Sequence, residues 1–174
     1  MSPVVDVVRT YLELCSPGDL RPADGGEPRA RFAPCDHITV GRYRALYGDV
    51  GRAWHWHDRD AWTDDELSVY LAEPNVHVWE CYVGQQTAGY FELRQTDDGA
   101  VEIVYFGLTG DFIGRGLGGA MLTRAVQEAW ALGASRVWLH TCTLDSPRAL
   151  PNYLARGFSL VRKERYTATL PDAR

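Results

Sequence analysis

Hydrophobic and polar positions along this chain follow two different periods, and the two periods separate strands from helices. Alternation with a period of two, together with β-branched and aromatic residues, is typical of strands. Segments with this character are 4–14, 77–83, 87–94, 101–108, 135–143 and, as one or two closing strands, 159–170. Short polar turns separate the three segments between 77 and 108, so we expect these three to be antiparallel neighbours in a meander.

Apolar residues at helical spacing occur in fewer places. Between 117 and 132 they recur every three or four positions, and Gly133 ends that predicted helix. Thr63 and Glu66 form a capping box, which predicts a short amphipathic helix at about 64–72. Both helices therefore carry one apolar face that must pack on the sheet.

Three further segments give weaker or broken patterns. Residues 38–48 have weak helical character, and the prolines and glycines of 16–34 predict a loop. After 146 the chain is helical in part, but Pro151 interrupts it. We expect one turn to end near Leu150 and a new helix to begin at Pro151, with Tyr153 in its first turn.

This order of elements predicts an α+β (mixed α/β) fold. The connection from 101–108 to 135–143 contains a helix and more than 20 residues, which is long enough for a parallel pair of strands. No repeat, low-complexity tract or linker interrupts the sequence, so we expect residues 1–174 to form a single domain. A chain of this length can bury a core without disulfides or a metal.

Composition and charge narrow the class of protein. The chain has 18 Lys and Arg against 23 Asp and Glu, a net charge of −5, which argues against a nucleic-acid partner. No apolar run reaches the roughly 20 residues that span a bilayer, and the N-terminus lacks a signal-peptide pattern. The four cysteines are dispersed, at Cys15, Cys35, Cys81 and Cys142. We expect a soluble cytoplasmic protein with free thiols and no membrane partner.

The most informative stretch is the glycine-rich segment 112–122, which follows a strand and opens a helix. Its glycines are Gly114, Gly116, Gly118 and Gly119. Backbone N–H groups without neighbouring Cβ atoms, at a helix N-terminus, form a cradle for anionic oxygens. Arg115 adds a guanidinium that can bind a phosphate through two donors. The segment therefore predicts a phosphate or pyrophosphate site.

Other interpretations of these glycines exist. Gly114, Gly116 and Gly119 match the dinucleotide-binding fingerprint, but that fingerprint requires a preceding βαβ strand and an acidic residue at the tip of the next strand. Neither condition is met, because a meander comes first and residues 137–140 contain no acid. A P-loop is excluded because no Gly-Lys-Ser/Thr follows. A glycine-rich turn that only packs is the structural alternative.

The segment Arg115-Gly116-Leu117-Gly118-Gly119 resembles the pyrophosphate loop of the GNAT superfamily of acyl-CoA-dependent N-acetyltransferases, written Gln/Arg-x-x-Gly-x-Gly/Ala. Here Ile113 occupies the first position of that motif. Residues 153–158 resemble the family's Tyr-x-x-x-Gly-Phe motif. Glu102 precedes the loop arginine by the spacing found in the histone-acetylating branch. Together the three motifs cover about residues 77–160.

This resemblance implies the GNAT fold, a central mixed and mostly antiparallel sheet flanked by helices. It also implies acetyl-CoA as co-substrate without a metal, and transfer of the acetyl group to a primary amine, on a small molecule, in a ternary complex. The implied coenzyme-binding residues are Phe106, Gly107, Leu108, Ile113, Gly114, Arg115, Gly116, Leu117, Gly118, Gly119 and Ala120. A non-catalytic module that binds acyl-CoA is the alternative function. Formation of a homodimer stays open.

The reaction needs a base because an amine with a pKa of about 10.4 is protonated at pH 7, and freeing its lone pair costs roughly 4.6 kcal/mol. Glu102 is the candidate base: it alternates with Val104 and Phe106 on what we expect to be an apolar strand face, where a carboxyl pKa rises. A structural ion pair is the alternative role of Glu102, and Glu92 is the second candidate base.

The tetrahedral intermediate and the leaving thiolate need two further groups. The resemblance assigns the oxyanion donor to the backbone N–H of Leu108. It assigns the proton donor for the thiolate to Tyr153, which is protonated at pH 7 because a phenol has a pKa near 10. The alternative for Tyr153 is packing alone. Cys142 and His140 offer a covalent route in which the thiol is the nucleophile.

On the acceptor side, residues 54–60 read Trp-His-Trp-His-Asp-Arg-Asp. Trp54 and Trp56 can enclose an amine by cation–π contact, with Asp58 supplying negative charge. Alternatively, the two tryptophans cap the core. A zinc site from two histidines and Asp58 is conceivable by composition, but the spacing fits no standard closed site.

Overall fold

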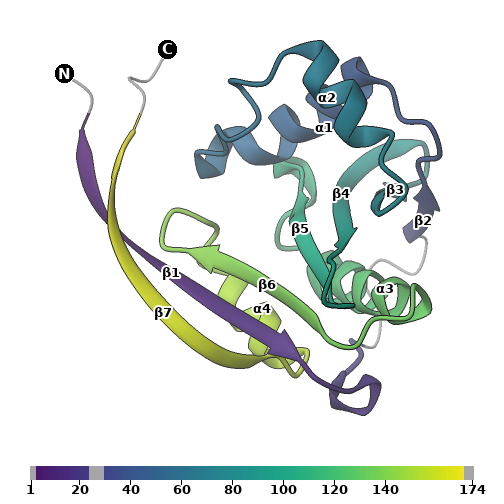
Figure 1. The fold of residues 1–174 in the computed structure, drawn as a ribbon, viewed down its shortest axis with the longest axis vertical. Helices are drawn as coiled ribbons and strands as arrows, with labels where there is room; N and C mark the ends of the chain where they lie inside the picture. The colour runs from purple at the N-terminus through teal and green to yellow at the C-terminus, as the bar shows by residue number, and fades with distance from the viewer. Residues whose placement is uncertain (1–2, 24–29, 171–174) are drawn as a thin grey trace.

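The computed structural model describes residues 3–23 and 30–170, which form a seven-stranded sheet with helices on both faces (Figure 1). The strands are β1 (Val4–Leu14), β2 (Ala30–Pro34), β3 (Val76–Val83), β4 (Gln86–Gln95), β5 (Val101–Leu108), β6 (Val137–Cys142) and β7 (Ser159–Thr169). The helices are α1 (Val40–Gly51), α2 (Asp64–Leu71), α3 (Leu117–Ala131) and α4 (Ala149–Ala155), with short 3₁₀ turns η1 (Pro17–Asp19), η2 (Arg52–Trp54) and η3 (Gly110–Phe112). Every predicted strand is present, and so are the predicted helices at 64–72 and 117–132 and the weakly helical segment 38–48.

Strand order in the sheet is β2-β3-β4-β5-β6-β1-β7. The predicted meander β3-β4-β5 is antiparallel, and β5 pairs with β6 in parallel, as the long connection through α3 requires. The first and last strands of the chain, β1 and β7, lie side by side as a long curved ribbon, in which Val4 pairs with Thr169 (Figure 1). The sheet is therefore mixed and mostly antiparallel, as expected.

Two hydrophobic clusters lie on opposite faces of the sheet because side chains alternate along each strand. Phe91 and Leu93 of β4 pack with Met121 and Leu122 on the α3 and α4 face. Tyr90 faces the other way and packs against α1 and α2. The predicted capping box of α2 is confirmed, since the side chains of Thr63 and Glu66 each accept a backbone N–H of the other residue.

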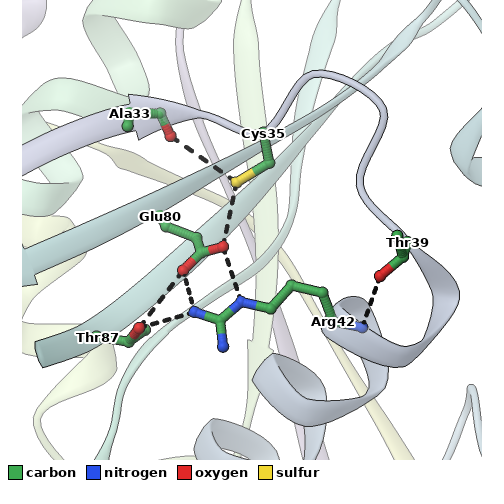
Figure 2. A network of polar contacts seen from close by, with 6 residues as sticks. All are labelled: Ala33, Cys35, Thr39, Arg42, Glu80 and Thr87. Atoms are coloured by element: carbon green, nitrogen blue, oxygen red, sulfur yellow. Dashed lines mark hydrogen bonds and ion pairs between the residues drawn. The ribbon is translucent and has the colours of Figure 1, made fainter.

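A buried carboxylate anchors α1 to the sheet (Figure 2). Glu80 of β3 is 4% exposed and forms an ion pair with Arg42, whose Nε lies 3.0 Å from Glu80 Oε1. Arg42 also donates to Thr87 Oγ1 at 2.7 Å, and Cys35 donates its thiol to Glu80 at 3.4 Å. This network joins α1 to two strands, β3 and β4, and to the segment after β2, so it holds α1 in place over the sheet.

Two local predictions are wrong. Residues 30–34 of the expected loop form β2, which pairs with β3 at the sheet edge. The last residue of β2, Pro34, has no backbone N–H, and an edge strand tolerates this because one of its sides has no neighbouring strand to bond. The expected break before Pro151 does not occur: α4 runs through it as one helix from Ala149. Pro151 is the third residue of α4, where the missing N–H would have no partner within the helix, so the proline costs no hydrogen bond. Tyr153 is accordingly the fifth residue of α4.

The face assigned to Glu102 also needs correction. Pairing between β4 and β5 shifts so that Glu92 lies opposite Tyr105 and Leu93 opposite Ile103, which leaves Val104 as an extra residue in β5. Such a bulge reverses the alternation of side chains beyond it. Glu102 therefore shares a face with Tyr105 instead of Phe106, and that face is the one covered by α1 and α2.

Candidate active site

The site begins where β5 and β6 separate. Their pairing ends at Glu102 and Trp138, although β5 continues for six more residues. A cavity of about 520 Å³ fills the resulting gap, and it contacts β5 from Ile103 to Leu108. A continuous sheet would have no room for a ligand here, so the divergence of the two strands creates the site.

At one end of the cavity lies the predicted glycine loop. Gly116 is the N-cap of α3, with φ at 79°, and no side chain caps the helix. Ile113, Gly114, Gly116, Gly118 and Gly119 line the cavity. The backbone N–H groups of the first turn of α3 therefore have no side-chain cap among residues 3–23 and 30–170, and they carry the positive end of the helix dipole. This arrangement fits the diphosphate of a nucleotide coenzyme.

Three of the predicted loop residues do not line the cavity. Leu117 is buried in the core beneath α3, and Ala120 follows it in the helix. Arg115 is exposed, and its guanidinium lies 5.0 Å from the centre of the Phe112 ring. Coenzyme contact stays a prediction at every position of the loop, and for these three the cavity lining gives it no support.

Two residues outside the glycine motif contribute to the same end of the cavity. Arg148 lies beside the loop, since a Cβ added at Gly114 would be 3.5 Å from Arg148 Nη1. Asn152 of α4 donates to the carbonyl of Gly118 at 3.1 Å. Sequence reasoning missed both, because only the packing of α4 on α3 brings them to the loop.

The backbone of β5 offers a free donor where it borders the cavity. Thr109 N–H donates to Ala88 of β4 at 2.9 Å. Because successive N–H groups in a strand point to opposite sides, the N–H of Leu108 points away from β4, toward the gap that β6 leaves. Phe106, Gly107 and Leu108 all line the cavity, so the predicted oxyanion donor lies at a suitable place.

Tyr153 lines the cavity from α4. Its ring packs between Phe106 and Phe158, with centroid distances of 6.1 Å to each. The hydroxyl has no hydrogen-bond partner among residues 3–23 and 30–170, and burial raises the pKa of the phenol. A phenol with a raised pKa stays protonated at neutral pH and can donate its proton.

The two candidate bases have different surroundings. Glu92 is fully buried and accepts hydrogen bonds from Tyr43 at 2.5 Å, from Tyr70 and from Arg59 at 3.4 Å. Its oxygens are therefore committed to holding α1, α2 and the loop between η2 and α2 on the sheet. Glu102 has no hydrogen bond to any of the described residues. Burial raises the pKa of its carboxyl, although the positive charge of Arg94 acts to lower it. Glu102 directly precedes the first β5 residue that lines the cavity.

The other end of the cavity has an aromatic wall. Trp54, Trp56 and Asp58 all line it, as predicted for an acceptor site. Trp56 also packs on Tyr105 with ring centroids 4.9 Å apart, so it caps the tyrosine cluster and borders the cavity at once. Its indole N–H donates to Asp145 at 3.4 Å, which links the loop after α1 to the loop after β6.

His140 and Cys142 line the cavity from β6, on the same strand face. No hydrogen bond joins them within the described ranges, and desolvation lowers the pKa of His140 while it raises the pKa of Cys142. A thiol with a raised pKa is a poor nucleophile at neutral pH. Among residues 3–23 and 30–170 there is no cluster of three or more metal-ligating side chains, and no helix there is long and apolar enough to cross a membrane.

The gap between β5 and β6, the glycine-rich N-terminus of α3, Leu108 and Tyr153 all border one cavity, an arrangement that would fit an acyl-coenzyme. In agreement, residues 43–158 match the model of the acetyltransferase (GNAT) family. This match covers more than half of the chain, so the protein belongs to the GNAT acetyltransferase family. No curated protein matches the sequence.

Solved structures show the same fold at low sequence identity. A GCN5-related N-acetyltransferase from Kribbella flavida is 18% identical with a TM-score of 0.67, and the match covers 98% of this chain and 61% of that one. A GCN5-related N-acetyltransferase from Sphaerobacter thermophilus is 16% identical with a TM-score of 0.64, and the match covers 97% of this chain and 53% of that one. An aminoglycoside acetyltransferase from an uncultured soil metagenomic sample is 12% identical with a TM-score of 0.62, over 75% of this chain and 88% of that one. This chain thus spans about three fifths of the Kribbella protein.

Proposed function

We propose that this protein transfers the acetyl group of acetyl-CoA to a primary amine of a small molecule by direct attack in a ternary complex. The observation that carries the proposal is the continuity of one cavity, which runs from the N-terminus of α3 past Leu108 and Tyr153 to the wall of Trp54, Trp56 and Asp58. Coenzyme and acceptor can therefore meet beside β5 without a covalent enzyme intermediate.

The amine must first lose a proton. Glu102 is the proposed base, because its carboxylate is free of hydrogen bonds to the described residues and its raised pKa brings it closer to that of an amine. Since Glu102 itself does not line the cavity, we propose that one water molecule relays the proton from the ammonium group to the carboxylate.

Attack of the amine forms the C–N bond and places negative charge on the thioester oxygen. The N–H of Leu108 is proposed to stabilise that oxyanion, a contribution of about 3–4 kcal/mol for one such donor. Collapse of the intermediate breaks the C–S bond, and the leaving thiolate takes the phenolic proton of Tyr153. The second proton of the attacking nitrogen passes through water to the Tyr153 phenolate and restores the phenol, while the first proton leaves Glu102 for solvent, so the proton balance closes.

The test is release of free thiol from acetyl-CoA across a panel of primary amines. Amine-dependent release with formation of the N-acetyl product supports the proposal. Coenzyme A binding without release for any amine would instead identify a non-catalytic acyl-CoA-binding module. Absence of coenzyme A binding in calorimetry would contradict both functions.

A further inference from the structure

Arg9 of β1 lines the acceptor end of the cavity, and its guanidinium is poorly satisfied. Nη2 lies 3.5 Å from the Tyr166 hydroxyl, and Nη1 lies 4.0 Å from Glu164. Nε is buried and has no hydrogen-bond partner among residues 3–23 and 30–170. A guanidinium has five N–H donors in a planar fork that matches a carboxylate, so Arg9 retains capacity for an anionic group.

Asp58 lines the same cavity from the loop after η2. Its carboxylate accepts one long hydrogen bond, from the Tyr105 hydroxyl at 3.4 Å, and forms no ion pair with the described residues. Arg9 and Asp58 do not form an ion pair with each other. The cavity therefore presents one positive and one negative side chain from separate elements, and neither neutralises the other.

His140 shows that these two charges act on the same region. Arg9 of β1 lies opposite Cys142 of β6. His140 is two residues from Cys142 on β6, so Arg9 and His140 share a sheet face. The charges of Arg9 and Asp58 both influence the pKa of His140, and desolvation is the main cause of its lowering. A neutral imidazole therefore lies in the range of both charges.

We propose that Arg9 and Asp58 select an acceptor that carries both a carboxylate and a primary amine, such as an amino acid. Arg9 would bind the carboxylate through two N–H donors, and Asp58 would bind the ammonium group before it is deprotonated. Trp54 and Trp56 would cover the apolar part of the molecule. This inference rests on the proposed acetyl transfer and names the class of acceptor.

The experiment uses matched pairs of acceptors, each an amino acid and the amine that lacks its carboxylate, for example phenylalanine with phenethylamine. Thiol release gives kcat and KM for the protein and for Arg9→Gln, Arg9→Lys and Asp58→Asn. Arg165→Gln is the matched control, because Arg165 is an exposed arginine of β7 that does not line the cavity.

For the unchanged protein we expect a higher kcat/KM with the carboxylated member of each pair. Arg9→Gln should raise KM about 10- to 100-fold for carboxylated acceptors and leave plain amines nearly unaffected, as expected for loss of a charged hydrogen-bonded pair. Arg9→Lys should be intermediate, Asp58→Asn should raise KM for both members, and Arg165→Gln should change KM for neither. Coenzyme A affinity should stay the same in all four variants.

Equal turnover of both members of each pair, or an equal loss for both in Arg9→Gln, would overturn the inference. If no amine releases thiol, the proposed function fails, and calorimetry of the same pairs with coenzyme A present still decides the inference. Binding of the carboxylated member that depends on Arg9 would support a carboxylate site. Absence of such binding would reject it.

Discussion

The indole N–H of Trp56 donates to Asp145 at 3.4 Å, and both residues line the cavity. Asp145 in turn accepts the Thr141 hydroxyl at 2.7 Å and the Cys142 backbone N–H at 3.0 Å. The loop that carries the acceptor wall is thus tied to the loop that follows β6. The position of Trp56 therefore sets the width of the cavity at its acceptor end.

Gly51 provides a way to displace Trp56. A Cβ at Gly51 would lie 2.5 Å from the Trp56 ring, whereas a Cβ at Gly48 on the same helix would lie 3.6 Å from Arg52 Nη2. We expect Gly51→Ala to lower the free energy of unfolding by about 1–3 kcal/mol through overpacking and to raise the acceptor KM. Gly48→Ala should leave both unchanged or slightly raise stability. Thermal unfolding and steady-state kinetics measure the difference, and equal behaviour of the two variants would contradict the role of Trp56.

Tyr153→Phe tests the proton donor. Removal of the phenolic oxygen should lower kcat by 10²- to 10⁴-fold while the coenzyme A dissociation constant stays constant, because the ring packing on Phe106 and Phe158 is retained. Tyr82→Phe is the control, since Tyr82 lies on β3, outside the cavity, with its ring under the Arg31 guanidinium at 4.4 Å. Unchanged turnover in Tyr153→Phe would leave this residue a packing role only.

Substitutions at Glu102 and Glu92 should separate catalysis from stability. Glu102→Gln should lower kcat/KM at pH 7 with little change in thermal stability, since no described residue depends on its carboxylate for a hydrogen bond. Glu92→Gln should lower stability by about 1–3 kcal/mol, because Tyr43, Tyr70 and Arg59 all donate to Glu92. The opposite outcome would assign the base to Glu92.

The pH dependence gives a further test of Glu102. Its pKa is raised above 4.5, and catalysis needs the carboxylate. The kcat/KM should therefore fall as pH decreases through that raised pKa, so the acid limb should lie above pH 4.5, and this limb should vanish in Glu102→Gln. If the limb persists in that variant, another group is the base, and His140, which lines the same cavity, would be the residue to substitute next.

The glycine loop can be tested with two glycines of the same backbone conformation. Gly116 has φ of 79° and Gly133 has φ of 83°, and at neither position would a Cβ meet another atom within 4 Å. Alanine at either position should cost about 1 kcal/mol of stability through left-handed strain. Because Gly116 lines the cavity at the N-terminus of α3 and Gly133 lies beyond its C-terminus, calorimetry should show weaker coenzyme A binding only for Gly116→Ala. Equal binding by both variants would exclude the loop as the coenzyme site.

The sequence by itself determined most of the elements, with β2 as the exception, and the glycine-rich N-terminus of α3. Local signals were sufficient there: alternation predicted the strands, the capping box predicted α2, and the glycine run predicted the cradle at α3. These features depend on residues close together in the chain, whose backbone preferences are largely local. The predicted helix break at Pro151 was wrong because a proline is tolerated in the first turn of a helix, and the sequence did not show that α4 begins at Ala149.

Only the tertiary structure decided which side chains meet around the acceptor. The Val104 bulge turned Glu102 to the other face of the sheet, and burial among two tyrosines and an arginine removed Glu92 as a free carboxylate. Arg9, at the start of the chain, reaches the cavity only because β1 inserts between β6 and β7. Such contacts join residues that are 22 positions apart, for Tyr70 and Glu92, to 157 positions apart, for Arg9 and Tyr166, and no periodicity within a segment encodes them. The reason is physical, since sheet register and strand order are set by packing of the whole core.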